Sequence, residues 1–374
     1  MFKYKPKKPL IALVLTTLPL VAVLASSFNA NAAENYKLRQ TPLGSFGGDI
    51  ATPADKPGFF GTASFTQLTI EGIKDSTGNT LPAPAKSGPV AAGITYTVAA
   101  GKINLKQDQT QLNVAAGYLT ESTYSDGRIA FVANIPFVKQ SRTASIVYPG
   151  SVISPTQAQA GYGPVVDNLV NTGALAQARA ATGDASGIGD TELSTVWIRH
   201  TGPLKVAAGV SIFVPTGKFS KSNDTVLLPN PGFGDFYTIR PGVAFSYNLN
   251  PSQAHQDWDA GVTVAGRVAY GINTRNKDTD YKSGNFVYSE AAIVKVAGDV
   301  AFGFNLSATE QVTDDSQGAV KTLIGRYKNY AAGPFFSYKF PGQDMGINFQ
   351  MNRNFSGRNA IDVTSYQLRL IKAF

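Results

Sequence analysis

The chain has 374 residues, no cysteine and only 16% charged residues, against roughly 25% in an average soluble domain. The lack of cysteine excludes disulfides and thiolate metal sites. The formal net charge is +8, but half of it comes from Lys3, Lys5, Lys7 and Lys8, so the basic balance does not indicate nucleic-acid binding. Glycine (37 residues), Phe (22) and Tyr (16) are abundant. A β-barrel uses glycine in a crowded interior and aromatic rings at two membrane interfaces.

The first 32 residues have the pattern of a secretory signal peptide. The lysines are followed by the apolar stretch Ile11–Ala25 and by the small-x-small sequence Ala30-Asn31-Ala32, which predicts cleavage after Ala32. An uncleaved anchor helix is the alternative, and the flanking residues disfavour it. No cysteine follows the apolar stretch, so a lipoprotein is excluded. No other segment approaches the ~18 apolar residues needed to span a bilayer as a helix.

The mature region, 33–374, begins with a Pro- and Gly-rich lead over 33–56 that has no periodicity. After it, apolar residues recur with the period of two that is typical of strands. The runs are about as long as a membrane-spanning strand, which takes 9–11 residues. Twelve strands are predicted, at 57–72, 108–122, 126–148, 188–200, 203–216, 233–250, 257–274, 284–298, 299–313, 322–340, 343–355 and 358–374.

In each strand one face is large and apolar, and the other is small or polar. Val206, Val210 and Ile212, for example, alternate with Gly209 and Ser211. A soluble sandwich also alternates, but glycine, alanine, serine and asparagine with isolated arginines suit a hydrated lumen better than a solvent-exposed sheet. The sequence therefore predicts an all-β protein, an antiparallel transmembrane β-barrel of about 12 strands with long external loops and one short helix in a loop.

The connections between the predicted strands alternate between short turns and mostly long loops, as they do in outer-membrane barrels. This pattern places both termini on the periplasmic side. The last strand has Tyr366, Leu368 and Leu370 on one face and ends at Phe374, a terminus that the barrel-assembly machinery would recognise. Lys372 interrupts the apolar face near the predicted rim, where its long side chain can reach water.

Two loop segments are expected to have structure of their own. Residues 80–106 contain the strand-like Ile94–Val98 and are compatible with a hairpin. Residues 156–182 have a helical pattern inside an insertion over 150–186. A surface helix is the favoured interpretation, and a helix that folds into the lumen or covers its mouth is the alternative.

The sequence offers little for catalysis. The mature region has only His200 and His255, and neither stands in a recognisable serine motif. Asp314-Asp315 lacks the spacing of a calcium loop, and Gly187–Asp190 lacks the helix that a phosphate-binding loop needs. We therefore predict no catalytic, metal or cofactor site, and a lipid-modifying outer-membrane enzyme is the least favoured class.

Several motifs together resemble a known family. They are Pro42–Phe46, Lys56-Pro57-Gly58, Gly187–Leu193, Trp197, Pro215–Phe219, Asn230–Val243, Asn273, Thr279–Gly284, Gln311–Asp315 and Ala332-Gly333-Pro334. In these motifs the chain is similar to the outer-membrane barrel family named for the meta pathway of phenol degradation, over nearly the whole mature region. Lys218-Phe219 differs from the acid and tyrosine more usual in that family, and 150–186 resembles an extension.

The resemblance implies import of small hydrophobic or aromatic compounds. We expect the barrel to be a passive route across the outer membrane of a Gram-negative bacterium, with membrane lipid and the solute as partners, and to be a monomer. A structural or surface-interaction barrel without transport is the alternative. Strand parity predicts charged residues in the lumen: Lys205, Arg240, Arg267, Lys295, Arg369 and Glu192. These charges would either make the bore basic or pair with one another as filler. Aromatic residues in the external loops are candidates for solute capture: Tyr148, Tyr162, Phe219, Phe233 and Tyr281.

Overall fold

The computed structural model describes residues 33–39, 56–225, 228–250, 261–318, 320–321 and 325–374. The predicted signal peptide, most of the lead and His255 lie outside these residues. The described residues form two compact units. One unit, here named the insertion unit, consists of Pro82–Ile103 and Ser145–Arg179. The other, the barrel unit, contains the remaining described residues.

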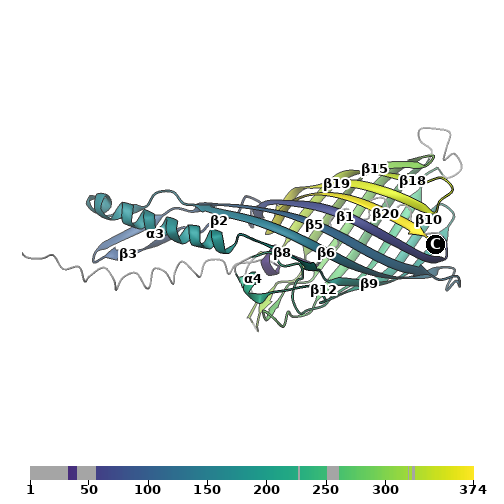
Figure 1. The fold of residues 1–374 in the computed structure, drawn as a ribbon, viewed down its shortest axis with the longest axis horizontal. Coiled ribbons are helices and arrows are strands. Elements are labelled where there is room, and N and C mark those ends of the chain that lie inside the picture. Colours follow the sequence, from purple (N-terminus) through teal and green to yellow (C-terminus); the bar gives the residue numbers. More distant parts are fainter. Residues whose placement is uncertain (1–32, 40–55, 226–227, 251–260, 319, 322–324) are drawn as a thin grey trace, which may run out of the picture. The chain divides into compact units, whose positions relative to one another are not determined.

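The barrel unit confirms the predicted closed antiparallel barrel of twelve strands (Figure 1). Neighbours in the chain pair with each other, and the ring closes because β1 pairs with both β20 and β5 while β5 also pairs with β6. The barrel strands are β1 (Gly58–Lys74), β5 (Gly101–Leu119), β6 (Arg128–Val147), β9 (Thr191–Thr201), β10 (Leu204–Val214), β11 (Thr238–Asn248), β12 (Val262–Asn273), β14 (Phe286–Ala297), β15 (Val300–Gln311), β18 (Lys328–Lys339), β19 (Met345–Arg358) and β20 (Ala360–Ala373).

Most strand boundaries agree with the predicted ones to within a few residues, and some strands begin farther from their predicted start. β5 begins at Gly101 instead of 108, β11 begins at Thr238 instead of 233, and β18 begins at Lys328 instead of 322. Residues Asn230–Phe236 leave the sheet to form the loop described below. The short strand β8 (Gly183–Ile188) was not predicted, and it pairs with β6 beyond the point where β9 begins.

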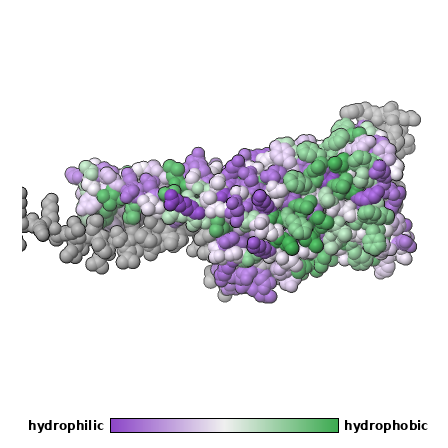
Figure 2. All heavy atoms as spheres, in the orientation of Figure 1, coloured by the Kyte–Doolittle hydropathy of each residue, from purple (hydrophilic) through white to green (hydrophobic). Residues whose placement is uncertain are grey.

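Successive side chains of a strand point alternately to the outside and to the inside of the barrel, as expected. In β20, Tyr366, Leu368 and Leu370 face outward and are 44%, 46% and 41% exposed, whereas Gln367 and Arg369 face inward and are buried. Figure 2 shows that hydrophobic residues gather on the visible face of the barrel, toward the end where Figure 1 marks the C-terminus. An apolar surface this extensive is typical of contact with lipid.

Aromatic pairs lie near both ends of the barrel. The rings of Phe59 and Tyr118 are 4.9 Å apart, near the start of β1. Tyr330 and Phe355 are 6.3 Å apart at the opposite end, where Phe355 bulges out of the register between β18 and β19. Rings at both rims suit the two lipid–water interfaces.

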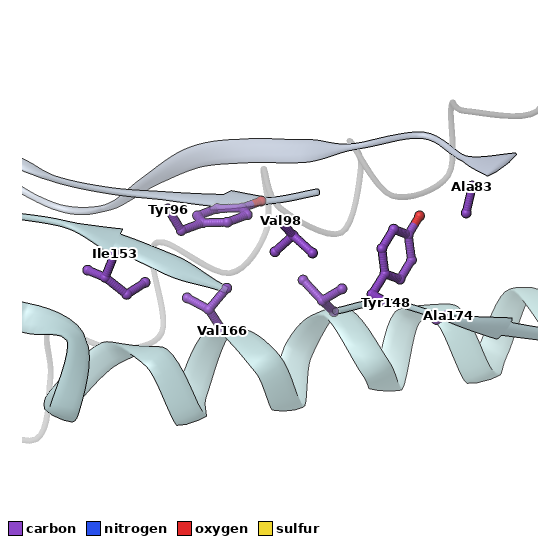
Figure 3. Packing of buried hydrophobic residues seen from close by; sticks show 8 residues of the cluster. Ala83, Tyr96, Val98, Tyr148, Ile153, Val166 and Ala174 are labelled. Atoms are coloured by element: carbon purple, nitrogen blue, oxygen red, sulfur yellow. The ribbon is translucent and has the colours of Figure 1, made fainter. Parts of the chain in front are cut away.

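The insertion unit has its own small core. Helix α3 (Gln159–Ala180) follows the short helix η2 (Thr156–Ala158) and packs against β3 (Lys86–Ala91), β4 (Ile94–Val98) and β7 (Val152–Ser154). The predicted hairpin and helix are thus present, and they form one unit. The core residues are Ala83, Tyr96, Val98, Tyr148, Ile153, Val166, Val170 and Ala174 (Figure 3). The two-residue strand β2 (Pro82–Ala83) pairs with the start of β5. None of the described helices is long and apolar enough to cross a membrane.

The core of the insertion unit gives a first testable prediction. Val170 is 2% exposed, whereas Val165 on the same helix is 56% exposed. We expect Val170→Asp to cost about 3 kcal/mol or more, since it buries an unpaired charge, and to make residues 82–103 and 145–179 sensitive to protease. Val165→Asp is the matched control and should leave the protease pattern unchanged. If both variants resist protease like the wild type, the described core does not hold the unit together.

The remaining elements of the barrel unit precede β1 or lie in the connections between strands, at the end where β1 finishes. They are η1 (Glu34–Tyr36), α4 (Lys221–Thr225), β13 (Tyr281–Lys282), β16 (Ser316–Gln317) and β17 (Val320–Lys321). β16 pairs with both β13 and β17 and ties two of the longer connections together.

Candidate functional site in the barrel lumen

The N-terminal segment, defined here as Ala33–Arg39, lies inside the ring of strands at the end where β1 finishes. Ala33 and Leu38 pack in a buried cluster with Phe286 and Tyr288, which are inward-facing residues of β14. Tyr327 and Ala360 complete this cluster. The segment therefore fills part of the lumen with the chain itself.

Arg39 anchors the end of the N-terminal segment. Its Nε lies 2.9 Å from Asp190 Oδ2, and the two side chains are only 1% and 3% exposed. Its other nitrogens donate to the backbone carbonyls of Phe236 and of Gly234, the latter at 2.8 Å. The guanidinium also lies over the Phe236 ring, 3.7 Å from its centroid. A buried charge with this many partners is firmly held.

Glycines in the surrounding loops explain how Asp190 is enclosed. Asp190 also accepts hydrogen bonds from the backbone N–H groups of Gly217 (3.0 Å) and Phe233 (3.1 Å). At Gly217 a Cβ atom would lie 2.6 Å from the Cα of Gly232 and 2.7 Å from Asp190 Oδ1, so only glycine fits. Burial raises the pKa of the Asp190 carboxyl, and Arg39 together with the two N–H donors opposes the rise.

A first cavity, of about 220 Å³, lies beside the N-terminal segment and is lined in part by Tyr36–Arg39. Glutamines from β5 form a ladder along it: Gln109 donates to Gln111 at 3.0 Å, and Gln111 donates to Asn113 at 2.7 Å. From β6, Gln140 donates to Gln109 at 2.8 Å and Arg142 donates to Gln107. This part of the wall is polar but mostly neutral.

A second cavity, of about 350 Å³, lies nearer the end of the barrel that carries Phe374. Two ion pairs sit in its wall. Arg240 of β11 pairs with Glu192 of β9, and Arg267 Nη2 of β12 lies 2.8 Å from Glu290 Oε2 of β14. Both guanidinium groups also lie over aromatic rings, Arg240 at 4.6 Å from the Phe213 centroid and Arg267 at 4.9 Å from that of Tyr288. The remainder of the lining includes apolar Phe60, Val132 and Val196.

Four of the predicted lumen residues lie in the wall of one cavity. Glu192, Arg240, Arg267 and Arg369 all line the second cavity. Lys205 has the inward parity of Ser211 on β10 but is not among the residues of the cavity wall.

The predicted position of Lys295 is wrong. In β14 the inward face carries the buried Tyr288, Glu290 and Val294, so Lys295 has the outward parity of Ile293, which is 52% exposed. The face with the large side chains points inward here because it packs under the N-terminal segment and against Phe335.

The five loop aromatics are not brought together. Tyr148 and Tyr162 pack in and against the core of the insertion unit, and Tyr281 is buried with its hydroxyl 2.7 Å from Asp315. Phe233 lines the first cavity, and Phe219 lies with it around a smaller pocket. Rings as buried as Tyr148 and Tyr281 offer no free face, so Phe233 is the best placed of the five to meet a solute.

Sequence reasoning missed the residues that hold the N-terminal segment in the lumen. Arg39 lies in the predicted lead over 33–56, and Asp190 lies at the beginning of the predicted strand 188–200, where no partner for it is predicted. The motifs Gly187–Leu193, Pro215–Phe219 and Asn230–Val243 did single out the loops that converge on Asp190. His200 is the penultimate residue of β9 and is exposed. Among the described residues no group of three His, Asp or Glu side chains is arranged to hold a metal ion.

Comparison with known proteins agrees with this geometry. The model of the family described as "Putative MetA-pathway of phenol degradation" matches residues 88–370. A search of the curated proteins finds no significant match. Among solved structures, the chain is similar to the COG4313 outer membrane channel from Pseudomonas putida F1, with 13% identity and a TM-score of 0.60, over 87% of this chain and 98% of that one. This likeness confirms the barrel fold.

Two weaker likenesses concern other barrels. The β domain of the Bordetella autotransporter BrkA has 9% identity and a TM-score of 0.45, over 85% of this chain and 100% of that one. The toluene transporter TodX of Pseudomonas putida has 12% identity and a TM-score of 0.34, over 93% and 96%. At these TM-scores neither carries weight for function.

Proposed function

The chain belongs to the family of the MetA pathway of phenol degradation, and on that premise we propose that it is an outer-membrane channel for passive uptake of small hydrophobic or aromatic compounds. The observation that carries the proposal is a closed barrel with an apolar outer surface and an internal cavity of about 350 Å³. An apolar protein cavity of about 150 Å³ is enough to bind benzene, so the lumen has room for an aromatic solute. The fold it shares with the Pseudomonas putida channel supports this proposal.

Of the three arginines that line the second cavity, Arg240 and Arg267 favour a neutral solute over an anionic one. Arg240 and Arg267 each have a carboxylate partner within the wall. Their positive charge is therefore largely compensated, which supports the filler interpretation over a basic bore. The apolar part of the lining and the arginine-covered rings suit a neutral aromatic compound.

The proposal includes the cellular setting. The chain would be exported after cleavage behind Ala32 and assembled in the outer membrane of a Gram-negative bacterium, with membrane lipid around the apolar band. The C-terminal strand ending at Phe374 would be the feature that the assembly machinery recognises, and the barrel would act as a monomer without enzymatic activity.

Planar-bilayer recording of the purified mature protein tests the function. We expect discrete conductance steps that neutral phenols and aromatic hydrocarbons reduce more strongly than benzoate does. Stronger block by benzoate would contradict the neutral-solute assignment while preserving a channel. A heat-modifiable barrel that conducts nothing and binds no aromatic compound would favour the structural or surface-interaction alternative.

A further inference from the structure

The backbone nitrogen of Ala33 lies in a buried carboxylate site. It donates to Asp315 Oδ2 at 2.7 Å, and Ala33 and Asp315 are 0% and 1% exposed. The same carboxylate accepts hydrogen bonds from the Tyr281 hydroxyl at 2.7 Å, the Gly284 N–H at 2.6 Å and the Gln311 amide at 2.7 Å. Asp315 thus receives four donors directed at its two oxygens.

The four donors are all neutral as long as Ala33 is part of a peptide bond. Within the described part of the chain, Asp315 then meets neutral donors and forms no ion pair, and burial raises the pKa of its carboxyl although the hydrogen bonds oppose the rise. A positive group at the position of the Ala33 nitrogen would satisfy this site, because buried charges in proteins are normally paired.

The backbone at Ala33 gives a second, independent indication. Its φ is 42° and its ψ is 127°, a combination that an L-residue with a Cβ rarely adopts and that is strained in mid-chain. The φ torsion is defined by the carbonyl carbon of the preceding residue. A chain that begins at Ala33 has no such torsion, so cleavage of the Ala32–Ala33 bond removes the strain.

From these contacts we infer that Ala33 is the first residue of the mature protein and that its α-ammonium group forms a buried ion pair with Asp315, which locks the N-terminal segment in the lumen. Hydrolysis of the Ala32–Ala33 peptide bond by a signal peptidase consumes one water and leaves a carboxylate on Ala32 and an amine on Ala33. An α-amine has a pKa of about 7.7–8.0, so it takes up a proton at neutral pH. The small-x-small pattern Ala30-Asn31-Ala32 marks the same bond.

The ion pair between the Ala33 α-ammonium group and Asp315 can form only if the chain is cleaved directly before Ala33. Consecutive Cα atoms are about 3.8 Å apart, so cleavage one residue earlier or later would move the ammonium group out of hydrogen-bond reach of Asp315. The next residue, Glu34, is also held in this position. Its N–H donates to Ser283 Oγ at 3.0 Å, and its carboxylate accepts from Asn276 at 3.0 Å. The inference rests on the export step of the proposed function and is independent of the solute.

The first test is the N-terminus of the protein isolated from outer membranes after expression of the full chain. Intact mass should correspond to a chain that begins at Ala33. Acylation of the Ala33 α-amine by an amine-reactive reagent, followed by peptide mass mapping, should be at least about tenfold slower in the folded barrel than in the denatured chain, as for a site that reacts only after local opening.

Two neighbouring aspartates provide the matched variants. Asp315→Asn should bring the labelling rate of Ala33 close to that of the denatured chain. Asp314→Asn should retain the protection, since the Asp314 side chain is 43% exposed and pairs with Arg326 at the surface. Heat-modifiable gel mobility establishes that each variant is a folded barrel. If Asp315→Asn does not assemble, the labelling rates of Ala33 in the folded and the denatured wild type still show whether the α-amine is protected.

A mature chain that begins at a residue other than Ala33, or wild-type Ala33 that reacts equally fast in the folded and denatured states, would overturn the inference. Neither readout depends on transport. A barrel that conducts nothing but protects its N-terminus would contradict the proposed channel alone.

Discussion

Arg39→Ala is expected to increase how often the lumen opens. Removal of the guanidinium leaves Asp190 and the carbonyls of Gly234 and Phe236 buried without their partner. Breaking one side of a buried ion pair costs about 3–5 kcal/mol, and each 1.4 kcal/mol is about a factor of ten in an equilibrium constant. The population in which the N-terminal segment has left the lumen should therefore rise about a hundredfold or more, which single-channel recording would detect as longer and larger openings.

Lys277→Ala is the appropriate control for Arg39→Ala. Lys277 pairs with Asp235 in a neighbouring loop at 3.4 Å, but its side chain is 75% exposed, and such surface pairs contribute little. Its currents should match those of the wild type. Were Arg39→Ala, once verified as a folded barrel, to conduct like the wild type as well, the N-terminal segment would not be what limits the current.

The pair Arg267–Glu290 should give the largest effect on barrel stability. The two side chains are 17% and 1% exposed, so Arg267→Met and Glu290→Leu each leave an uncompensated charge in the wall. Each single variant should lose about 3 kcal/mol of unfolding free energy. The double variant should lose less than the sum of the two by about 2 kcal/mol, since the removal of both charges leaves none unpaired. Denaturant unfolding in detergent micelles measures this cycle.

The pair Lys328–Glu310, at 3.0 Å with side chains 40% and 39% exposed, serves as the reference cycle. An exposed pair of this kind should show a coupling of no more than about 1 kcal/mol. Additive losses for Arg267 and Glu290, within about 0.5 kcal/mol, would mean that the cavity wall is hydrated enough to solvate either charge alone.

The strand plan could be predicted from the sequence because each barrel strand must satisfy two different environments at alternate residues. In β20 this rule places Leu368 and Leu370 outside and Gln367 and Arg369 inside. The rule fails for Lys295, because in β14 the apolar Phe286 and Val294 belong to the interior. Where the N-terminal segment fills the lumen, the inward face of β14 is apolar because it packs against that segment. The period of two alone does not show which face of a strand is inside.

The position of the N-terminal segment in the lumen could not be predicted for a different reason. The N-terminal segment is short and has no period, and its partners are remote in the chain: Arg39 and Asp190 are 151 residues apart, and Ala33 and Asp315 are 282 apart. The loops that converge there were recognisable by their glycines, but a resemblance between motifs does not show what they surround. The helix of the insertion was predicted, whereas its burial against the 86–98 hairpin depends on packing that the local pattern does not encode.

The seam between β1 and β20 has a topological consequence for assembly. It joins the first and last strands of the ring through a register that runs from Phe60↔Ala373 to Lys74↔Ala360, so the ring is open until the last strand has been delivered. The N-terminal segment precedes β1 and yet lies inside the ring, at the end opposite to the start of β1. If the ring closed first, a free chain end would have to be threaded through it. If β20 pairs with β1 while the N-terminal segment is already in place, this threading step is avoided. The closed barrel then surrounds its own N-terminal segment.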